Sequence, residues 1–384
     1  MTIPHIDYYL FGTHVRFGRG CAEALRLELE ALGSARPVIL MQQRMAASEV
    51  WATLRLTLSG MDTRVFTSVP EHSSVQWVES VAREIANSEC DSIVAIGGGS
   101  VSDSAKALSM LLSEGGCLAD HATHFTPPSA VEIPLRTQAK LPIISLPTTA
   151  SGAEVTPSFG VREGEHKQLF WNRQLASTTI LIDPLLSHDI PLKLMRYTAM
   201  NGMAHCFEGM YSRNSSPISD SIALQSVELF ARALTDESMS PDEQRWRLLL
   251  AGHLSGVVLS MAKTCLHHAI CHVIGARHNV GHGEVNTIVL PHALRFNEEI
   301  AGTNLMPALA VLNSVSGTEH TRVADWISAV IKRLGLPSSL SEIGIAGGDL
   351  PAIAEQTMKE RGLAVNPRSV THSDEVLSIL RQAA

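Results

Sequence analysis

The sequence predicts an α/β amino-terminal half built on a parallel sheet, followed by an all-α carboxy-terminal half. Short apolar, β-branched runs alternate with helix-length segments up to about residue 182, and this alternation is typical of βαβ units. After Asp183-Pro184 the apolar residues recur at spacings of three and four, which indicates helices. Because the chain has 384 residues and a domain usually has about 100–200, we expect two domains, 1–183 and 184–384.

The strands and helices of the first half follow from its apolar runs. Strands are predicted at Pro37–Met41, Thr63–Phe66, Asp91–Ile96, Leu141–Leu146 and Thr178–Ile182. Because these runs are continuously apolar, the sheet should be covered by helices on both faces. Helices are predicted at Cys21–Leu32, Ala46–Leu58 and Ser74–Ala86. The stretch from Leu111 to Lys140 contains Gly115-Gly116 and Pro127-Pro128, so we expect a helix end followed by a surface excursion.

The second half is predicted to be helical throughout. Helices are expected at Ile218–Leu234, Glu243–Met261, Val323–Leu334 and Leu350–Arg361. No internal repeat interrupts this pattern.

The composition narrows the class of protein. With 45% hydrophobic and 18% charged residues the chain can bury a sizeable core, and its net charge of −8 argues against a dedicated nucleic-acid or membrane-surface binder. The six cysteines form no CxxC pair, which argues against a zinc knuckle. The first twelve residues, MTIPHIDYYLFG, lack the pattern of a signal peptide, and no apolar run is long enough to span a membrane, so we expect a cytoplasmic protein.

A glycine-rich turn follows the third predicted strand, in the segment Ile96–Lys106 (IGGGSVSDSAK). Glycines let a backbone approach a phosphate closely, and a helix amino terminus supplies free N–H groups, so this turn is a candidate pyrophosphate site. The candidate cofactor residues here are Gly97, Gly98, Gly99, Ser100 and Asp103. The alternative is a plain strand-to-helix turn capped by Ser100 or Ser102.

A second polar loop follows the fourth predicted strand, in the segment Leu146–Thr156 (LPTTASGAEVT). The hydroxyls of Thr148, Thr149 and Ser151 could donate to a phosphate or to a nicotinamide carboxamide. The alternative is a capped loop without a ligand.

The 17 histidines are concentrated in one region. Asn201 and His205 are four residues apart, as are His268 and His272, so each pair should share one face of a helix. His282 follows in an expected loop, and three imidazoles from two helices and this loop could converge as a metal site requires. The alternative is that these histidines are packing residues.

These motifs, in this order, resemble the iron-containing (group III) alcohol dehydrogenase superfamily, and the sequence is most similar to its maleylacetate reductase branch. The resemblance runs from Val15–Gly18 (VRFG) through GGGSVSDSAKA and LPTTASGAEVTP to LHHAICHVIG and HGEVNTIVLPHALRFN. It implies a dehydroquinate-synthase-like fold, with a nucleotide-binding domain, a helical domain, an active site in the cleft between them, and a homodimer.

The resemblance also implies a position for a metal ion, at which one ligand of this sequence differs from the family pattern. Alcohol dehydrogenases of the family hold a metal with one Asp and three His, and the matching residues here are Asn201, His205, His268 and His282. The Asp is thus replaced by Asn201, as in the metal-independent maleylacetate reductases. In contrast, Asp103 is shared with the alcohol dehydrogenases, and Asn286 stands where the reductases tend to carry a further His.

We therefore expect an NAD(P)H-dependent oxidoreductase that reduces a small oxoacid, as maleylacetate reductases do in the degradation of aromatic compounds. His268 and His272 should polarise or protonate the reacting group, with His205 and His282 completing the polar surround. Lys167 and Arg173 are candidates for holding the substrate carboxylate, or else solvated loop cations.

Three other functions remain open: a metal (Fe or Zn)-dependent alcohol dehydrogenase or aldehyde reductase, a synthase that uses NAD transiently, and an inactive binding protein. The strand that ends at Met41 is followed by Gln42, Gln43 and Arg44. No acidic residue is present there to claim the ribose 2′-hydroxyl, and Arg44 could help to bind a 2′-phosphate. We expect the protein to use NADH and to tolerate NADPH, with Gln42 near the cofactor.

Overall fold

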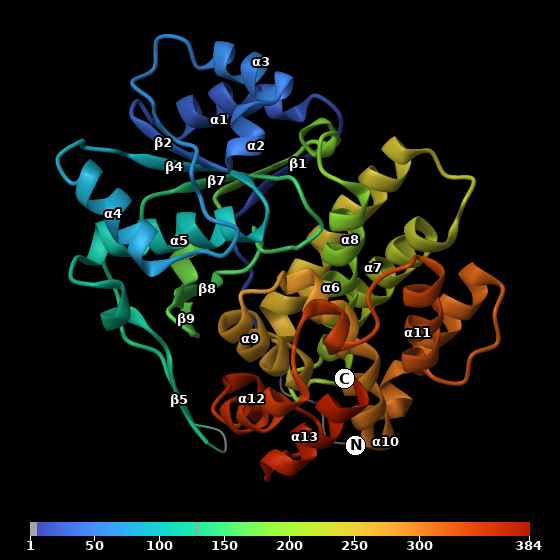
Figure 1. Cartoon of the computed structure of the whole chain (residues 1–384). Coiled ribbons are helices and arrows are strands. Elements are labelled where there is room, and N and C mark those ends of the chain that lie inside the picture. The colour runs from blue at the N-terminus through green and yellow to red at the C-terminus, as the bar shows by residue number, and fades with distance from the viewer. Residues whose placement is uncertain (1–5, 128–129) are drawn as a thin grey trace.

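The structure, a computed structural model, describes residues 6–127 and 130–384. Residues 1–5 of the amino-terminal segment and Pro128 of the expected break lie outside this range. The strands and helices α1–α5 lie in one half of the molecule and helices α6–α13 in the other, as Figure 1 shows. The predicted fold class, an α/β half followed by an all-α half, is confirmed.

The main sheet has six parallel strands in the order β1-β10-β7-β4-β2-β3. Their bounds are β1 His14–Phe17, β2 Pro37–Met41, β3 Arg64–Phe66, β4 Ser92–Gly97, β7 Ile143–Pro147 and β10 Thr179–Ile182. All five predicted strands form. The sequence analysis missed β1, a short polar strand at the sheet edge, so the glycine-rich turn follows the fourth strand and not the third.

Helices cover both faces of this sheet. Their bounds are η1 Cys21–Ala24, α1 Leu25–Ala31, α2 Gln43–Ala46, α3 Glu49–Thr57, α4 Val75–Ile85 and α5 Gly99–Glu114. In β4, Ile93 and Ala95 pack with α4 and α5, whereas Val94 and Ile96 pack with α1 and α3. Burial on both faces explains why the strand has no apolar–polar alternation.

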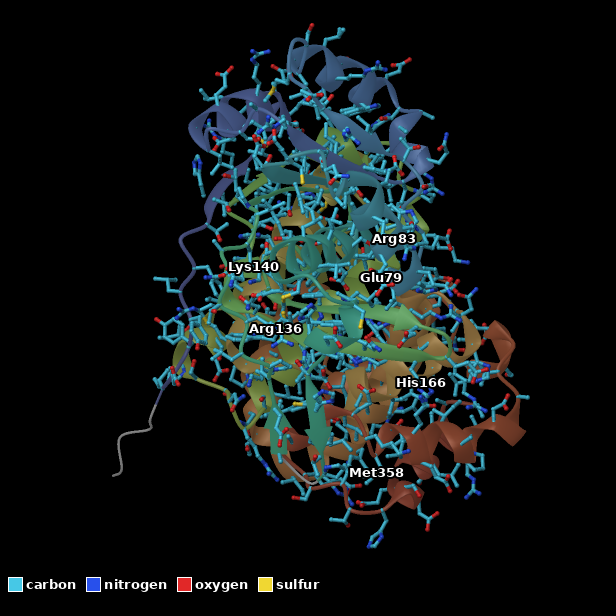
Figure 2. All side chains as sticks on the ribbon, turned by 90° about the vertical axis from the view of Figure 1, so that its left-hand side faces the viewer. Glu79, Arg83, Arg136, Lys140, His166 and Met358 are labelled. Atoms are coloured by element: carbon cyan, nitrogen blue, oxygen red, sulfur yellow. The ribbon has the colours of Figure 1, made fainter. Side chains whose placement is uncertain are left out.

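Two antiparallel hairpins were not predicted. The excursion after α5 contains η2 Leu118–His121, β5 His124–Thr126 and β6 Ala130–Glu132, and the second hairpin is formed by β8 Ser158–Glu163 and β9 His166–Trp171. Lys140 and Arg136, labelled in Figure 2, anchor the excursion through Glu114 (2.5 Å) and His121 (2.6 Å). The short helices η3 Arg173–Leu175 and η4 Pro184–Ser187 lead into the second half.

The second half contains only helices among the described residues. They are α6 Leu192–Tyr211, α7 Pro217–Thr235, α8 Pro241–Ala262, α9 Leu266–His278, α10 His282–Ser316, α11 Val323–Arg333, η5 Leu340–Ile343, η6 Gly347–Asp349, α12 Leu350–Thr357, η7 Arg361–Val365 and α13 Ser373–Gln382. The four predicted helices all form, although the last one ends at Thr357. The domain boundary at Asp183 stays a prediction.

No single helix in the described chain is long and apolar enough to cross a membrane. Helices α8 and α9 pass that test only as a pair, and they are bent by 107° at the break between them.

The loop after β7 packs directly on helix α8 through glycines. Gly152 has φ +68°, and a Cβ there would lie 2.5 Å from the carbonyl oxygen of Gly252. A Cβ on Gly256 would lie 2.3 Å from the carbonyl oxygen of Gly152. Because all of these neighbours are backbone atoms, no side chain can move away to make room.

Gly256→Ala is therefore expected to destabilise the protein by about 1–3 kcal/mol, the usual cost of overpacking. Gly302→Ala is the matched control, because a Cβ on Gly302 of α10 meets nothing within 4 Å. In a helix that change should be neutral or stabilising by up to about 1 kcal/mol. Urea denaturation of both variants measures the difference, and equal stabilities would contradict the close contact.

Candidate functional site

The two polar loops of the α/β half lie side by side at the carboxyl edge of the sheet. Strands β4 and β7 are paired, with Gly97 opposite Pro147, and the amide of Thr148 donates to the carbonyl oxygen of Gly97 at 3.1 Å. Gln42 follows the neighbouring strand β2 and is half-buried at the start of α2. The chain reverses its direction across the sheet between β2 and β4, and such a switch point is where open α/β sheets bind ligands.

The amino terminus of α5 lies at this edge, directly after strand β4. Its N-cap is Gly98, which provides no side-chain cap, so neither Ser100 nor Ser102 is the N-cap. A Cβ on Gly98 would lie 2.9 Å from Oγ1 of Thr149, so a side chain there would press on the second loop. The hydroxyls of Thr149 and Ser102 are buried without a hydrogen-bond partner. Free amides and unpartnered hydroxyls fit a pyrophosphate and a carboxamide.

Asp103 and Lys106 tie α5 to the second loop and to strand β8 that follows it. The carboxylate of Asp103 accepts from the amide of Gly160 on β8 at 3.2 Å. The buried ammonium of Lys106 donates to the carbonyl oxygen of Ala153 at 2.5 Å. Asp103 therefore has a structural partner in addition to its predicted place near the cofactor.

The structure brings the four predicted histidines together. The ring centroids of His205 (α6) and His268 (α9) are 4.8 Å apart, and those of His268 and His282 are 6.3 Å apart. His272 stacks on His282 at 5.7 Å. His282 was expected in a loop, but it is the first residue of α10. This end of α10 lies against α6, since a Cβ on Gly283 would come within 2.7 Å of Tyr197.

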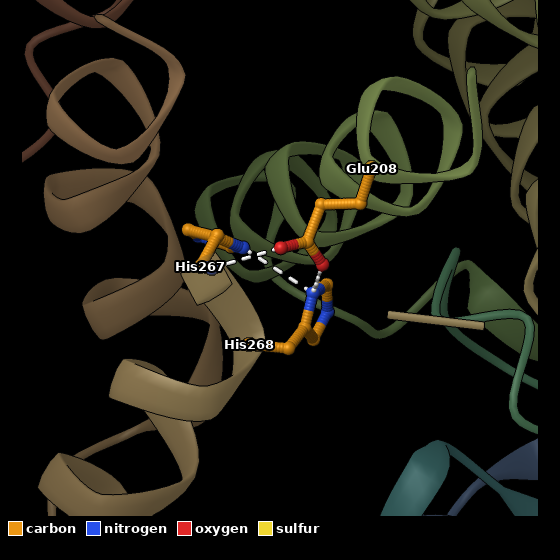
Figure 3. Close-up of side chains that lie close together, drawn as sticks. All are labelled: Glu208, His267 and His268. Atoms are coloured by element: carbon orange, nitrogen blue, oxygen red, sulfur yellow. Dashed lines mark hydrogen bonds and ion pairs between the residues drawn. The ribbon is translucent and has the colours of Figure 1, made fainter. Parts of the chain in front are cut away.

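Glu208 is a site residue that the sequence analysis missed. It lies in α6, fully buried, and its carboxylate is 2.6 Å from Nδ1 of His268 (Figure 3). The same carboxylate accepts from the backbone amide of His267 at 2.8 Å. A usable signal was its spacing, because Glu208 is three residues after His205 and so close to the same helix face.

The opposite nitrogen of His268 faces Asn201. Its Nε2 is 3.1 Å from Oδ1 of Asn201, so His268 is held between a carboxylate and an amide. Burial raises the pKa of Glu208 and lowers the pKa of His268. Both shifts disfavour a charge-separated pair of carboxylate and imidazolium.

The other imidazoles are neutral for the same reason. Burial lowers the pKa of His205, His272 and His282 well below the ordinary value for histidine. The ammonium of Lys167, on β9, adds to this effect for His272 and His282, as it does for His268. Lys167 is therefore close enough to act electrostatically on the histidine group.

Arg173, the other predicted substrate residue, is exposed on η3. Within the described part of the chain it makes no hydrogen bond or ion pair with the histidines. A second missed residue is Glu360, whose carboxyl group is 3.2 Å from Nδ1 of His272. It is 88 positions away in the sequence, and no pattern there could have identified it.

The predicted metal position is not a closed metal site in the described structure, because the nitrogens of its three histidines do not all lie within 4.8 Å of one another. His205, His268 and His282 supply imidazole nitrogens, Nδ1 of His205 is buried without a partner, and Asn201 adds only a neutral oxygen. Glu208 on Nδ1 of His268 is the carboxylate that commonly orients a metal-binding histidine. Glu208, His267 and His268 also offer ligand atoms within 4.8 Å of one another, but these atoms already take part in the hydrogen bonds of Figure 3.

Comparison with known proteins places this site in a family. The family model for iron-containing alcohol dehydrogenases matches residues 12–184, and the model for the carboxy-terminal part of the Fe-containing alcohol dehydrogenase family matches residues 195–384. Maleylacetate reductase 1 of Cupriavidus pinatubonensis is 30% identical over 98% of this chain and 96% of its own length.

Two solved structures show the same fold. The maleylacetate reductase from Agrobacterium tumefaciens has a TM-score of 0.80 and 24% identity, covering 99% of this chain and 98% of that one. A variant of an archaeal halo-thermophilic alcohol dehydrogenase from a Red Sea brine pool has a TM-score of 0.91 and 20% identity, with 100% of both chains covered. The chain therefore belongs to the iron-containing alcohol dehydrogenase family, a family of NAD(P)-dependent oxidoreductases.

Proposed function

We propose that this protein is an NAD(P)H-dependent reductase of a small dianionic oxoacid, similar to maleylacetate, in the breakdown of aromatic compounds. The observation that carries the proposal is the packing of β9, which carries Lys167, against α9, which carries His268 and His272. The ammonium of Lys167 lowers the pKa of these histidines, and Asn201 stands beside them in place of an acidic residue. A site with this charge suits an anionic substrate. The likeness to maleylacetate reductases over nearly the full chain supports the same substrate class.

The two halves, 1–183 and 184–384, would act as separate domains with different tasks. The pyrophosphate of the cofactor would bind Gly97–Ser100 at the start of α5, near Asp103, and the carboxamide would bind Thr148, Thr149 and Ser151. Gln42 and Arg44 would lie near the adenosine ribose, which suits NADH and tolerates NADPH. The nicotinamide supplies a hydride to the substrate. We further propose a cytoplasmic homodimer.

The helical half would supply the proton and the polar surround. His268 and His272 would polarise or protonate the reacting group, while His205 and His282 complete the wall around it. Lys167 would pair with a substrate carboxylate, and this pairing would place the reacting bond against the histidines.

A metal-dependent alcohol dehydrogenase or aldehyde reductase is the second candidate. The unpartnered Nδ1 of buried His205, beside His268, favours it. A divalent ion at Asn201, His205, His268 and His282 would supply Lewis-acid polarisation of the carbonyl.

Substrate and metal dependence separate the two candidates. We expect NADH oxidation with maleylacetate and related oxoacids but not with simple aldehydes, and no loss of activity with a chelator. Asn201→Asp should raise the affinity for Zn²⁺ measured by calorimetry, because it adds a charged oxygen ligand. Loss of activity with a chelator, restored by Fe²⁺ or Zn²⁺, would instead establish the dehydrogenase.

The cofactor assignment predicts the effect of a side chain at the start of α5. Gly98→Val should weaken NADH binding at least tenfold in a fluorescence titration, because its Cβ would lie 2.9 Å from Thr149 and fill the approach to the amides. Gly12→Val is the control, since a Cβ there meets nothing within 4 Å. Unchanged affinity in a folded Gly98→Val protein would remove the pyrophosphate from this turn.

If Lys167 binds a substrate carboxylate, its removal should weaken the binding of dicarboxylic substrates. A hydrogen bond to a charged group contributes about 1.5–3 kcal/mol, so Lys167→Ala should raise KM for a dicarboxylic oxoacid roughly 10- to 100-fold. Lys332→Ala, at an exposed lysine of α11, should have no effect. An unchanged KM in steady-state kinetics of Lys167→Ala would assign substrate binding to other residues.

A further inference from the structure

Glu360 is a nearly buried acid at the end of the histidine group. It lies just before η7, and its side chain is 16% exposed. Its Oε2 is 3.2 Å from Nδ1 of His272. The side chain of His272 is 15% exposed, so this pair lies closer to solvent than the Glu208–His268 pair, whose exposures are 0% and 3%.

The hairpin β8–β9 closes over the same region. The side-chain amide of Gln356, at the end of α12, is 3.0 Å from Nδ1 of His166. Lys167 follows His166 and acts electrostatically on both His272 and Glu360. Strand β9 and the segment of η7 both pack against α9, so Lys167, Glu360 and His272 come from three neighbouring elements.

We propose that Glu360 is a positioning residue that holds His272 through Nδ1 and passes it the proton needed for reduction. The inference rests on the proposed function, in which His272 touches the substrate. With Nδ1 directed to Glu360, the opposite nitrogen, Nε2, faces away from the carboxyl group and can donate to the substrate.

The proton balance is complete in this arrangement. The nicotinamide hydride adds to one atom of the substrate double bond, and the Nε2 proton of His272 goes to the other atom. His272 recovers a proton at Nδ1 from the Glu360 carboxyl group. After the product leaves, Nδ1 returns this proton to the Glu360 carboxylate and Nε2 takes a proton from water, which restores the starting tautomer. His272 changes tautomer but gains no net charge, which suits its buried position.

The charges around Glu360 suit this cycle. Burial raises the pKa of Glu360 to about 7, while Arg361 beside it and Lys167 on β9 act in the opposite direction. His272 faces it from α9. The acid is thus protonated below about pH 7 and can donate, and above that pH it is ionised and cannot.

The test compares Glu360→Gln, Glu360→Asp and Glu355→Gln in single-turnover oxidation of bound NADH at saturating substrate, from pH 5 to 9. Glu355 is an exposed acid of α12 and serves as the control. Glutamine matches protonated glutamic acid in shape and charge, so the Glu360→Gln protein should fold. Thermal melts of the variant check that it does. Glu360→Asp tests rescue by a shorter acid.

We expect the wild-type rate to fall tenfold per pH unit above about pH 7, and the control to behave in the same way. Glu360→Gln should lose this dependence and react roughly 10- to 100-fold more slowly at pH 6, with unchanged NADH affinity, while Glu360→Asp keeps part of both rate and pH dependence. A wild-type rate that is flat through pH 7, or a Glu360→Gln protein with wild-type rate and profile, overturns the inference.

This experiment can support or overturn the role of Glu360 independently of whether the proposed oxoacid substrate is correct. Every carbonyl reduction consumes one proton, so the same profiles are measured on whichever substrate the wild-type protein reduces. If that substrate is an aldehyde and not an oxoacid, the proposed function fails while the role of Glu360 is still decided by the variants.

Discussion

The close approach of the loop after β7 to helix α8 is the constraint on which the rest of the site depends. At Gly152, Gly252 and Gly256 the two backbones meet without side chains between them. The same loop is joined to α6, because the amide of Ala150 donates to Oγ1 of Thr198 at 3.2 Å. Helix α6 carries Asn201, His205 and Glu208. The loop proposed to hold the nicotinamide is thus fixed, by backbone contacts, relative to the groups proposed to supply the proton.

The buried cluster of histidines and Glu208 is tolerated in an apolar core because most of its polar atoms have a hydrogen-bond partner. A buried polar atom without a hydrogen bond costs about 1–3 kcal/mol. Glu208 has two partners in the backbone of His267 and the ring of His268, and His267 has the carbonyl oxygen of Asn286. These contacts fix the orientation of His268 before any ligand binds. Nδ1 of His205 and Oδ1 of Asn286 are exceptions, and an unsatisfied buried atom in such a network is a place where a ligand, an ion or a water can bind.

The fold could be predicted from the sequence where periodicity is strong. Four of the five predicted strands are continuously apolar and form with both faces buried, as in β4, whereas β3 at the sheet edge is mostly exposed. Strand β1 has only four residues, half of them exposed, so it has no apolar run from which it could be predicted. The β8–β9 hairpin depends on pairing across the turn at Gly164, and it too lacks a continuous apolar run. Asn201, His205, His268 and His272 could be grouped because helix spacing relates positions four apart. Glu360 meets His272 only through the packing of η7 on α9, which no local pattern encodes.

The charge distribution gives a physical reason for substrate-dependent reactivity. In the free protein, burial and the ammonium of Lys167 keep His268 and His272 neutral. Under the proposed function, a dianionic substrate pairs with Lys167 and cancels the field that this ammonium exerts on the rings. The negative charge of the substrate then raises the pKa of both imidazoles, because an opposite charge within a few ångströms favours the protonated form. The transfer of a proton from Glu360 to Nδ1 of His272 is therefore easiest when the substrate is in place. Since the site is largely withdrawn from water, this effect is stronger than it would be at the surface.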